Sequence, residues 1–161
     1  MKYERNAKKC FLLILGFGIT FLLFLISFLP FFFKTLAFAQ VNTINGNITN
    51  PEEGQRVTDR IEVGGTLSAS LPINHHLWIV VRRGNLLWPK EPEVFVTGNS
   101  WESTVFEGGR GQFRLVLFLV NEEGQREIRD WLRVGTDTGH FPGLESISRS
   151  FALDAVNVRG Q

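Results

Sequence analysis

The chain begins with an apolar stretch, Cys10 to Phe33, that is unlike anything after it. A helix over this stretch would be about 36 Å long, enough to cross the roughly 30 Å hydrocarbon core of a bilayer. Basic residues precede it at Lys2, Arg5, Lys8 and Lys9, whereas Lys34 alone follows it closely. Because cations collect on the cytoplasmic side, the pattern predicts that this segment enters a membrane and that the chain after Lys34 is exported.

Two fates of this segment are compatible with the sequence. Its length exceeds that of a usual signal-peptide core, which favours a retained anchor with the following domain outside the cytoplasm. Ala37 and Ala39, however, occupy the positions that a signal peptidase recognises before Gln40. The alternative is cleavage near Ala39 and a secreted or periplasmic product. In both cases the chain divides into a segment 1–39, with the apolar run 10–33, and an exported domain 40–161.

The exported part alternates between apolar and polar positions in the manner of β-strands. Arg60 to Leu67 has period two, and the pair Gly64-Gly65 within it indicates a bulge or a close backbone approach. Leu77 to Val81 and Phe113 to Val120 are continuous apolar runs too short for helices, so we expect central strands covered on both faces. Trp78, inside the first run, is predicted to be core between two sheets.

Turn residues separate further short strands. Gly84-Asn85 is a two-residue hairpin signal, and the strand that returns from it, Leu86 to Trp88, is expected to end at Pro89 and Pro92. The other predicted strands are Ile44 to Thr49, which lies at an edge, Glu93 to Thr97, Trp101 to Phe106 and Ser150 to Arg159.

The period changes to helical in one place. Ile128, Trp131 and Leu132 have the spacing of one helix face, and Gly135 stands where a left-handed residue would end the helix. This predicts one short helix over Gln125 to Gly135, followed by a polar loop from Thr136 to Gly143.

Seven or so short strands with turn chemistry between them predict an all-β, antiparallel sandwich with one short helix. Trp78 on a central strand and the Gly98-x-x-Trp101 step into a later strand resemble bacterial immunoglobulin-like modules of exported and surface proteins. The resemblance covers residues 43–159 and implies an immunoglobulin-like sandwich. Many members of that family are spacers or binding modules. The helix and the loop around His140 depart from the family pattern.

Charge and cysteine content narrow the function. Without residues 1–39 the chain keeps 12 Lys plus Arg against 15 Asp plus Glu, a net charge of about −3, so we expect no nucleic-acid partner. The one cysteine of the chain, Cys10, lies before the exported part, which excludes disulfides, thiol catalysis and cysteine-ligated zinc there. No cofactor is expected.

The residues that would support catalysis or metal binding are poorly arranged. No serine stands in a Gly-x-Ser-x-Gly turn with a histidine nearby, and Glu91 and Glu93 flank Pro92 in a predicted surface turn. His75 and His76 are neighbours on a strand and face opposite ways, so they and His140 do not form a metal site. We therefore expect a protein that is not an enzyme; a hydrolase on a sandwich scaffold is the alternative.

Five residues are candidates for ligand binding. Arg82 and Arg83 at the hairpin either bind an anionic group or act as charged gatekeepers of the apolar strand. Trp88 has little predicted sheet to pack on and either stacks on a sugar or packs under a loop. His140 and Phe141 lie in a glycine-rich loop where polar and aromatic groups can converge.

Together these patterns predict a non-catalytic binding or interaction module at the cell envelope. Its expected contacts are the membrane, through residues 10–33, and a glycan or protein partner. A structural accessory subunit of a larger envelope protein is the alternative. The sequence leaves the ligand and the oligomeric state open.

Overall fold

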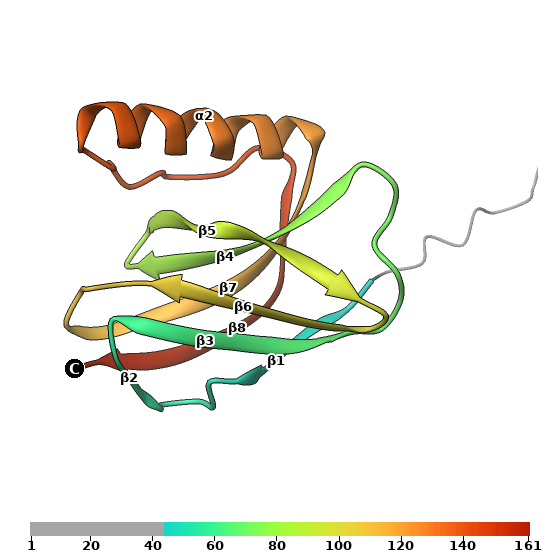
Figure 1. Ribbon diagram of the computed structural model, residues 1–161, viewed down its shortest axis with the longest axis horizontal. Coiled ribbons are helices and arrows are strands. Elements are labelled where there is room, and N and C mark those ends of the chain that lie inside the picture. The colour runs from blue at the N-terminus through green and yellow to red at the C-terminus, as the bar shows by residue number, and fades with distance from the viewer. Residues whose placement is uncertain (1–43) are drawn as a thin grey trace, which may run out of the picture. The chain divides into compact units, whose positions relative to one another are not determined.

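A computed structural model of the protein describes residues 44–161, most of which lie in β-strands. The predicted membrane segment 10–33 and the cleavage position at Ala39 lie outside these residues. No helix among residues 44–161 has the length and the hydropathy that crossing a membrane requires. The described part contains a single helix, so the expectation of a mostly β protein with one helix is confirmed (Figure 1).

The strands form one curled sheet of eight strands in the order β1-β3-β6-β5-β4-β7-β8-β2. In chain order the elements are β1 (Gly46–Asn50), β2 (Arg56–Val57), β3 (Arg60–Leu67), β4 (His75–Arg83), β5 (Leu86–Thr97), β6 (Ser100–Phe106), β7 (Gly111–Asn121), α2 (Glu122–Thr138) and β8 (Ser150–Gly160). The backbone nitrogen of Ile48 in β1 donates to Asp154 Oδ2 in β8 at 2.7 Å. This contact brings β1 back against β8 and encloses a core.

Strand β5 links the two halves of the curled sheet. Its first part pairs with β4, and its last residues, Phe95 to Thr97, pair with β6. The sequence predicted two strands interrupted at Pro89 and Pro92, and this prediction was wrong. The backbone nitrogen of Leu87 points away from β4, because it donates to the oxygen of Leu144. The nitrogen of Pro89, two residues on, points to the same side, which is an edge of the sheet where no N–H donor is needed. Pro92 falls in a bulge where the β4–β5 register shifts.

The two central apolar runs lie where the sequence placed them. Strand β4 pairs with β5 on one side and β7 on the other, and β7 lies between β4 and β8. The inward side chains Leu77, Ile79 and Val81 join the main core, while Trp78 and Val80 point to the other face and join a second buried cluster. Both faces are therefore covered, as predicted. Trp78 is buried, but beneath helix α2 and not between sheets.

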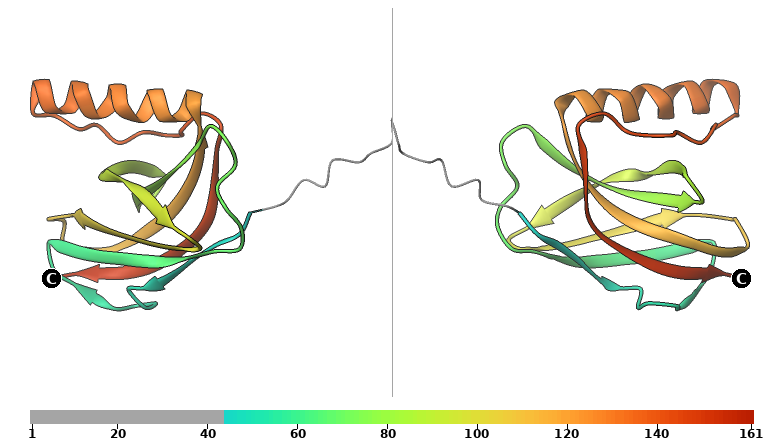
Figure 2. Two further views of the ribbon diagram at one scale, coloured as in Figure 1. Left: turned by 45° about the vertical axis from the view of Figure 1, so that its right-hand side comes forward. Right: turned by 180° about the vertical axis from the view of Figure 1, so that it is seen from behind.

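Helix α2 lies across the outer face of β4 and β7, and Figure 2 shows this arrangement from two further sides. It begins directly after β7, where the Asn121 side chain accepts from the backbone nitrogens of Glu123 and Gly124, and it ends at Gly139 with φ 69°. The predicted end at Gly135 was wrong. Gly135 lies inside the helix. A glycine is needed there because the ring of Phe141 occupies the space that a side chain would fill.

Candidate functional site: an arginine face

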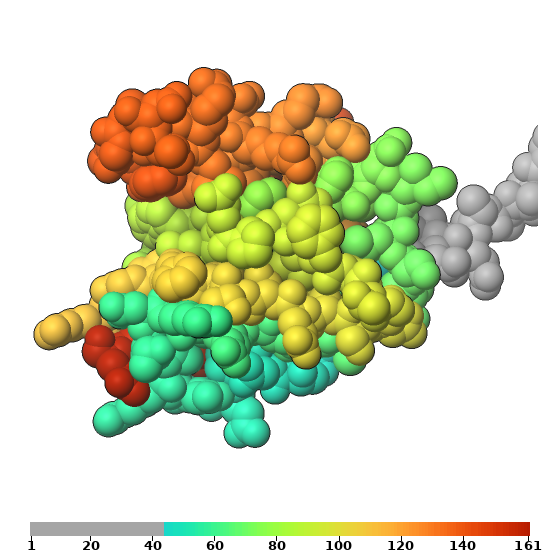
Figure 3. Space-filling model, in the orientation of Figure 1, coloured from blue at the N-terminus to red at the C-terminus, as the bar shows by residue number. Residues whose placement is uncertain are grey.

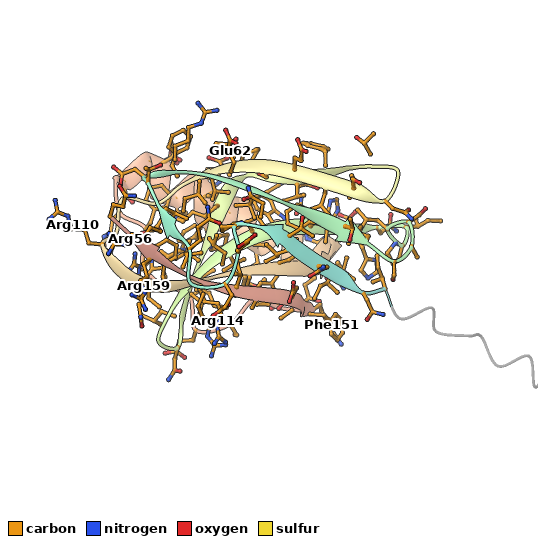
Figure 4. All side chains as sticks on the ribbon, turned by 90° about the horizontal axis from the view of Figure 1, so that it is seen from below. Arg56, Glu62, Arg110, Arg114, Phe151 and Arg159 are labelled. Carbon is orange, nitrogen blue, oxygen red and sulfur yellow. The ribbon has the colours of Figure 1, made fainter. Side chains whose placement is uncertain are left out.

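A group of arginines occupies the outer face of β4, β7, β8 and β2, beyond the area that α2 covers. Arg82 lies directly opposite Arg114, and Arg114 lies opposite Asn157. In the next row Arg159 has Gln112 on one side and Arg56 on the other. We call Arg56, Arg82, Arg114 and Arg159, all exposed, the arginine face. Figure 4 shows Arg56, Arg114 and Arg159 along one side of the molecule, with Glu62 on the opposite side.

The charges of this face are not paired within the described residues. No ion pair of residues 44–161 involves any of these guanidinium groups. An acid close to Arg114 is Glu53, whose carboxylate accepts from the Asn157 backbone nitrogen at 2.9 Å and from the Asn157 side chain at 2.7 Å. These two hydrogen bonds, with a smaller contribution from Arg114, hold the pKa of Glu53 below its usual value. Glu53 thus remains an anion at the margin of the face.

The arrangement is unfavourable for folding. Neighbouring strands are about 4.8 Å apart, and like charges directly opposite each other across a strand pair are destabilising. Arg82 opposite Arg114, and Arg56 beside Arg159, are such pairs. Asn157 Oδ1 accepts from Arg114 Nε at 3.1 Å, which orients one guanidinium group without neutralising it. A bound anion would relieve the repulsion.

Arg83, the sequence neighbour of Arg82, has a different role. It lies on the other face of β4, where its guanidinium group donates to Glu107 Oε1 at 3.2 Å and to the backbone oxygens of Gly109 and Arg110. It also stacks over the ring of Phe113 at 4.6 Å. Burial raises the pKa of Glu107, but contacts with Lys90 and Arg83 outweigh it and hold that pKa low. The two arginines that the sequence grouped in one site thus point to opposite faces of β4, although both line a hollow of about 300 Å³ at the end of the strand.

The other candidate residues lie near one another at the far end of α2. Trp88 Nε1 donates to the backbone oxygen of Phe141 at 3.1 Å, and Trp131 Nε1 donates to that of Pro142 at 2.8 Å. The Phe141 ring meets the Trp131 ring edge-on at 5.3 Å between centroids. His140 is exposed. Trp88 thus holds the segment 139–149, which we call the strap, against strand β5, and Trp131 holds it against helix α2.

Sequence reasoning missed three members of the arginine face. Arg114 stood out only as the single charge in an apolar run, and Arg56 and Arg159 lie far apart in the chain. Their meeting depends on the β7–β8 register and on the parallel β2–β8 pair, which no local pattern encodes. No protein-family model matches the chain, and a search of curated proteins finds no match.

Proposed function

We propose that the exported part is an immunoglobulin-like β-sandwich that acts as a non-catalytic binding module at the cell envelope and takes an anionic partner on the arginine face. The strand order supports the fold. Strands β1, β3 and β6 form one layer and β4, β7 and β8 the other, with β5 pairing in both. If β1 and β3 to β8 are lettered A to G, the order is ABED in one layer and CFG in the other, as in the immunoglobulin sandwich.

One observation carries the functional part of the proposal: Arg82 and Arg114 face each other across two strands with no carboxylate partner among the described residues. Guanidinium groups bind phosphate, sulfate and carboxylate through paired N–H donors. Because the face extends over four strands, it fits a partner that presents several anionic groups on an extended surface better than it fits one small anion.

The test uses the full chain in a non-ionic polyoxyethylene detergent, with dextran sulfate as the anionic probe and unsubstituted dextran as its uncharged counterpart. We expect binding to dextran sulfate that weakens steeply with salt. An Arg82→Gln/Arg114→Gln variant should bind at least about tenfold more weakly, a loss of about 1.4 kcal/mol.

The matched control removes two exposed arginines from helix α2, Arg126→Gln/Arg133→Gln. It changes the net charge by the same amount and should retain nearly full binding. Equal losses in both double variants would show that only net charge matters and would refute a localised face.

Export and anchoring form a separate part of the proposal, supported by the apolar run 10–33 and the cations before it. Protease added to intact spheroplasts should digest the domain and leave a membrane-bound fragment. An intact chain in the soluble cytoplasmic fraction would contradict export. A soluble product that begins at Gln40 would contradict only the anchor.

A further inference from the structure

The face of the molecule opposite the arginines contains a hollow of about 720 Å³. It lies on β1, β3 and β6, the side seen in Figure 3. Gly64 is one of the residues that line it. Along β3, Glu62 and Thr66 stand before and after Gly64 on the same face; across the strands, Gly64 is paired with Glu102 on β6 and Asn50 on β1. The central position of this grid has no side chain, and the residues around it line the hollow.

The fold does not require a glycine at this position. The next residue, Gly65, is required, because a Cβ there would collide with the backbone oxygen of Asn47 and lie 2.7 Å from the Trp101 ring. At Gly64 the nearest atoms to a Cβ would be Trp101 O at 3.4 Å and Glu102 Cγ at 3.5 Å, which are ordinary contacts. Gly64 also has no positive φ. Gly64 and Gly65 lie opposite a bulge in β1, where the β1–β3 register shifts between Ile48 and Asn50, as the sequence predicted for this glycine pair. A glycine inside a strand accompanies a bulge or leaves room for a ligand or another backbone, and on the outer face of β3 Gly64 leaves such room.

The side chains around Gly64 define the chemistry of what would approach. Glu62 and Glu102 are exposed and take part in no ion pair of residues 44–161. Hydroxyl groups line the rest of the hollow, from Thr49, Thr66, Ser100 and Thr104. Phe95, the neighbour of Glu102 in the same row on β5, is 75% exposed. The hollow thus combines strong acceptors with groups that both donate and accept, and one open aromatic ring lies beside it in the Glu102 row.

We infer that this hollow binds neutral sugar units of a glycan. Sugar hydroxyl groups donate to carboxylates and exchange hydrogen bonds with serine and threonine, and the apolar face of a pyranose stacks on an aromatic ring. Anionic ligands would be repelled by Glu62 and Glu102. A purely apolar ligand would bury both carboxylates without partners. The site is separate from the arginine face and does not depend on it.

The experiment measures binding of cellohexaose, chitohexaose and maltohexaose to the full chain by calorimetry. A polyoxyethylene detergent is needed, because the sugar heads of glycoside detergents would compete. We expect at least one of the three to bind with a Kd below about 1 mM. Because neutral sugars carry no charge, this Kd should change less than about twofold between roughly 50 and 500 mM salt.

Two variants locate the site. Gly64→Ala places a methyl group in the hollow and should weaken binding at least about tenfold while the melting temperature stays the same or rises. Phe95→Ala, at an exposed position, should weaken binding to a similar extent. Gly108→Ala is the matched control, since a Cβ there meets nothing within 4 Å and the residue lies outside the hollow.

Three outcomes would overturn the inference: none of the oligosaccharides binds, Gly64→Ala and Phe95→Ala both bind as tightly as the unaltered protein, or the control loses binding equally. Salt-sensitive binding of polylysine that requires Glu62 and Glu102, with no sugar bound, would assign the hollow to a cationic partner instead. None of these results bears on the arginine face, which the dextran sulfate experiment tests.

Discussion

The indole nitrogen of Trp78 donates a hydrogen bond to Gln125 Oε1 at 2.5 Å, and this buried contact joins strand β4 to helix α2. Gln125 is the one buried polar side chain in the described part of the chain. Its amide nitrogen donates in turn to Glu93 Oε2 at 2.6 Å. The Trp78, Gln125 and Glu93 side chains are thus joined in one series of hydrogen bonds, which fixes the helix at one position over the sheet together with the apolar packing.

Replacing Gln125 by Leu should lower the free energy of unfolding by about 1–3 kcal/mol, because it leaves the Trp78 N–H buried without an acceptor. Urea denaturation measures the change. In the double variant Trp78→Phe/Gln125→Leu the unpaired N–H is gone, so the loss should be smaller than the sum of the two single losses. Strictly additive losses would show that the two side chains are not coupled.

Stability should also depend on pH through Glu93. Burial raises the pKa of this carboxyl, but hydrogen bonds from His76, Gln125 and Arg129 outweigh it and hold the pKa below the usual value of 4.5. The folded protein therefore binds fewer protons here than the unfolded chain. The contribution of Glu93 is complete above about pH 4.5 and is lost as the pH falls through the lower, folded-state pKa.

We expect the difference in unfolding free energy between the unaltered protein and Glu93→Gln to be largest near pH 6 to 7 and to shrink toward about pH 3. Denaturation curves at a series of pH values measure it. Glu145→Gln, at an exposed position, should show no such trend. A difference that grows on acidification would mean that the sign of the Glu93 contribution is wrong.

The neighbours Arg82 and Arg83 should respond oppositely to the same change. Arg83→Gln removes an ion pair with Glu107 and two hydrogen bonds to backbone oxygens, and should destabilise by about 1–3 kcal/mol. Arg82→Gln removes repulsion from Arg114 and also an exposed hydrogen bond from Arg82 Nε to the Gly84 oxygen, 3.1 Å long; because that bond is open to water, the net change should be a stabilisation of about 0.2–1 kcal/mol at low salt. Added salt should reduce the second effect. Thermal melts of both variants at two salt concentrations measure this; destabilisation by Arg82→Gln would argue against the repulsion.

Local patterns were sufficient for the central strands of the sheet. The runs around Ile79 and Leu117 have apolar residues at consecutive positions, so both faces of these strands were predicted to be buried. Both strands do lie in the middle of the sheet, with apolar clusters on both faces. Which element covers each face could not be predicted from the sequence. Trp78 packs under α2 because it points to the outer face of β4, which the helix covers. The sequence alone does not distinguish a second sheet from a helix as the layer on that face.

Predictions failed where a distant contact overrides a local signal. Gly135 has the sequence context of a helix end, but it lies inside the helix. The Phe141 ring packs against it from the strap, and a larger residue at position 135 would collide with that ring. Pro89 normally interrupts a strand, yet it is tolerated here because its nitrogen faces an edge. The arginine face could not be predicted for the same reason: it depends on strand register. The true helix start did have a local signal, since Asn121 followed by Glu122 and Glu123 is a capping sequence.

Gly135 offers a sharp test of how the strap is held. Replacing a glycine inside a helix by alanine ordinarily stabilises by about 1 kcal/mol. Here the added methyl group would overlap the Phe141 ring, so Gly135→Ala should instead lower the melting temperature and expose the strap to protease. The sign should reverse when the ring is removed: in a Phe141→Ala background, the same Gly135→Ala change should raise the melting temperature, because only the helix propensity remains. Stabilisation in both backgrounds would show that the ring does not rest on Gly135, and that the strap is held by its hydrogen bonds to Trp88, Trp131 and Leu87 instead.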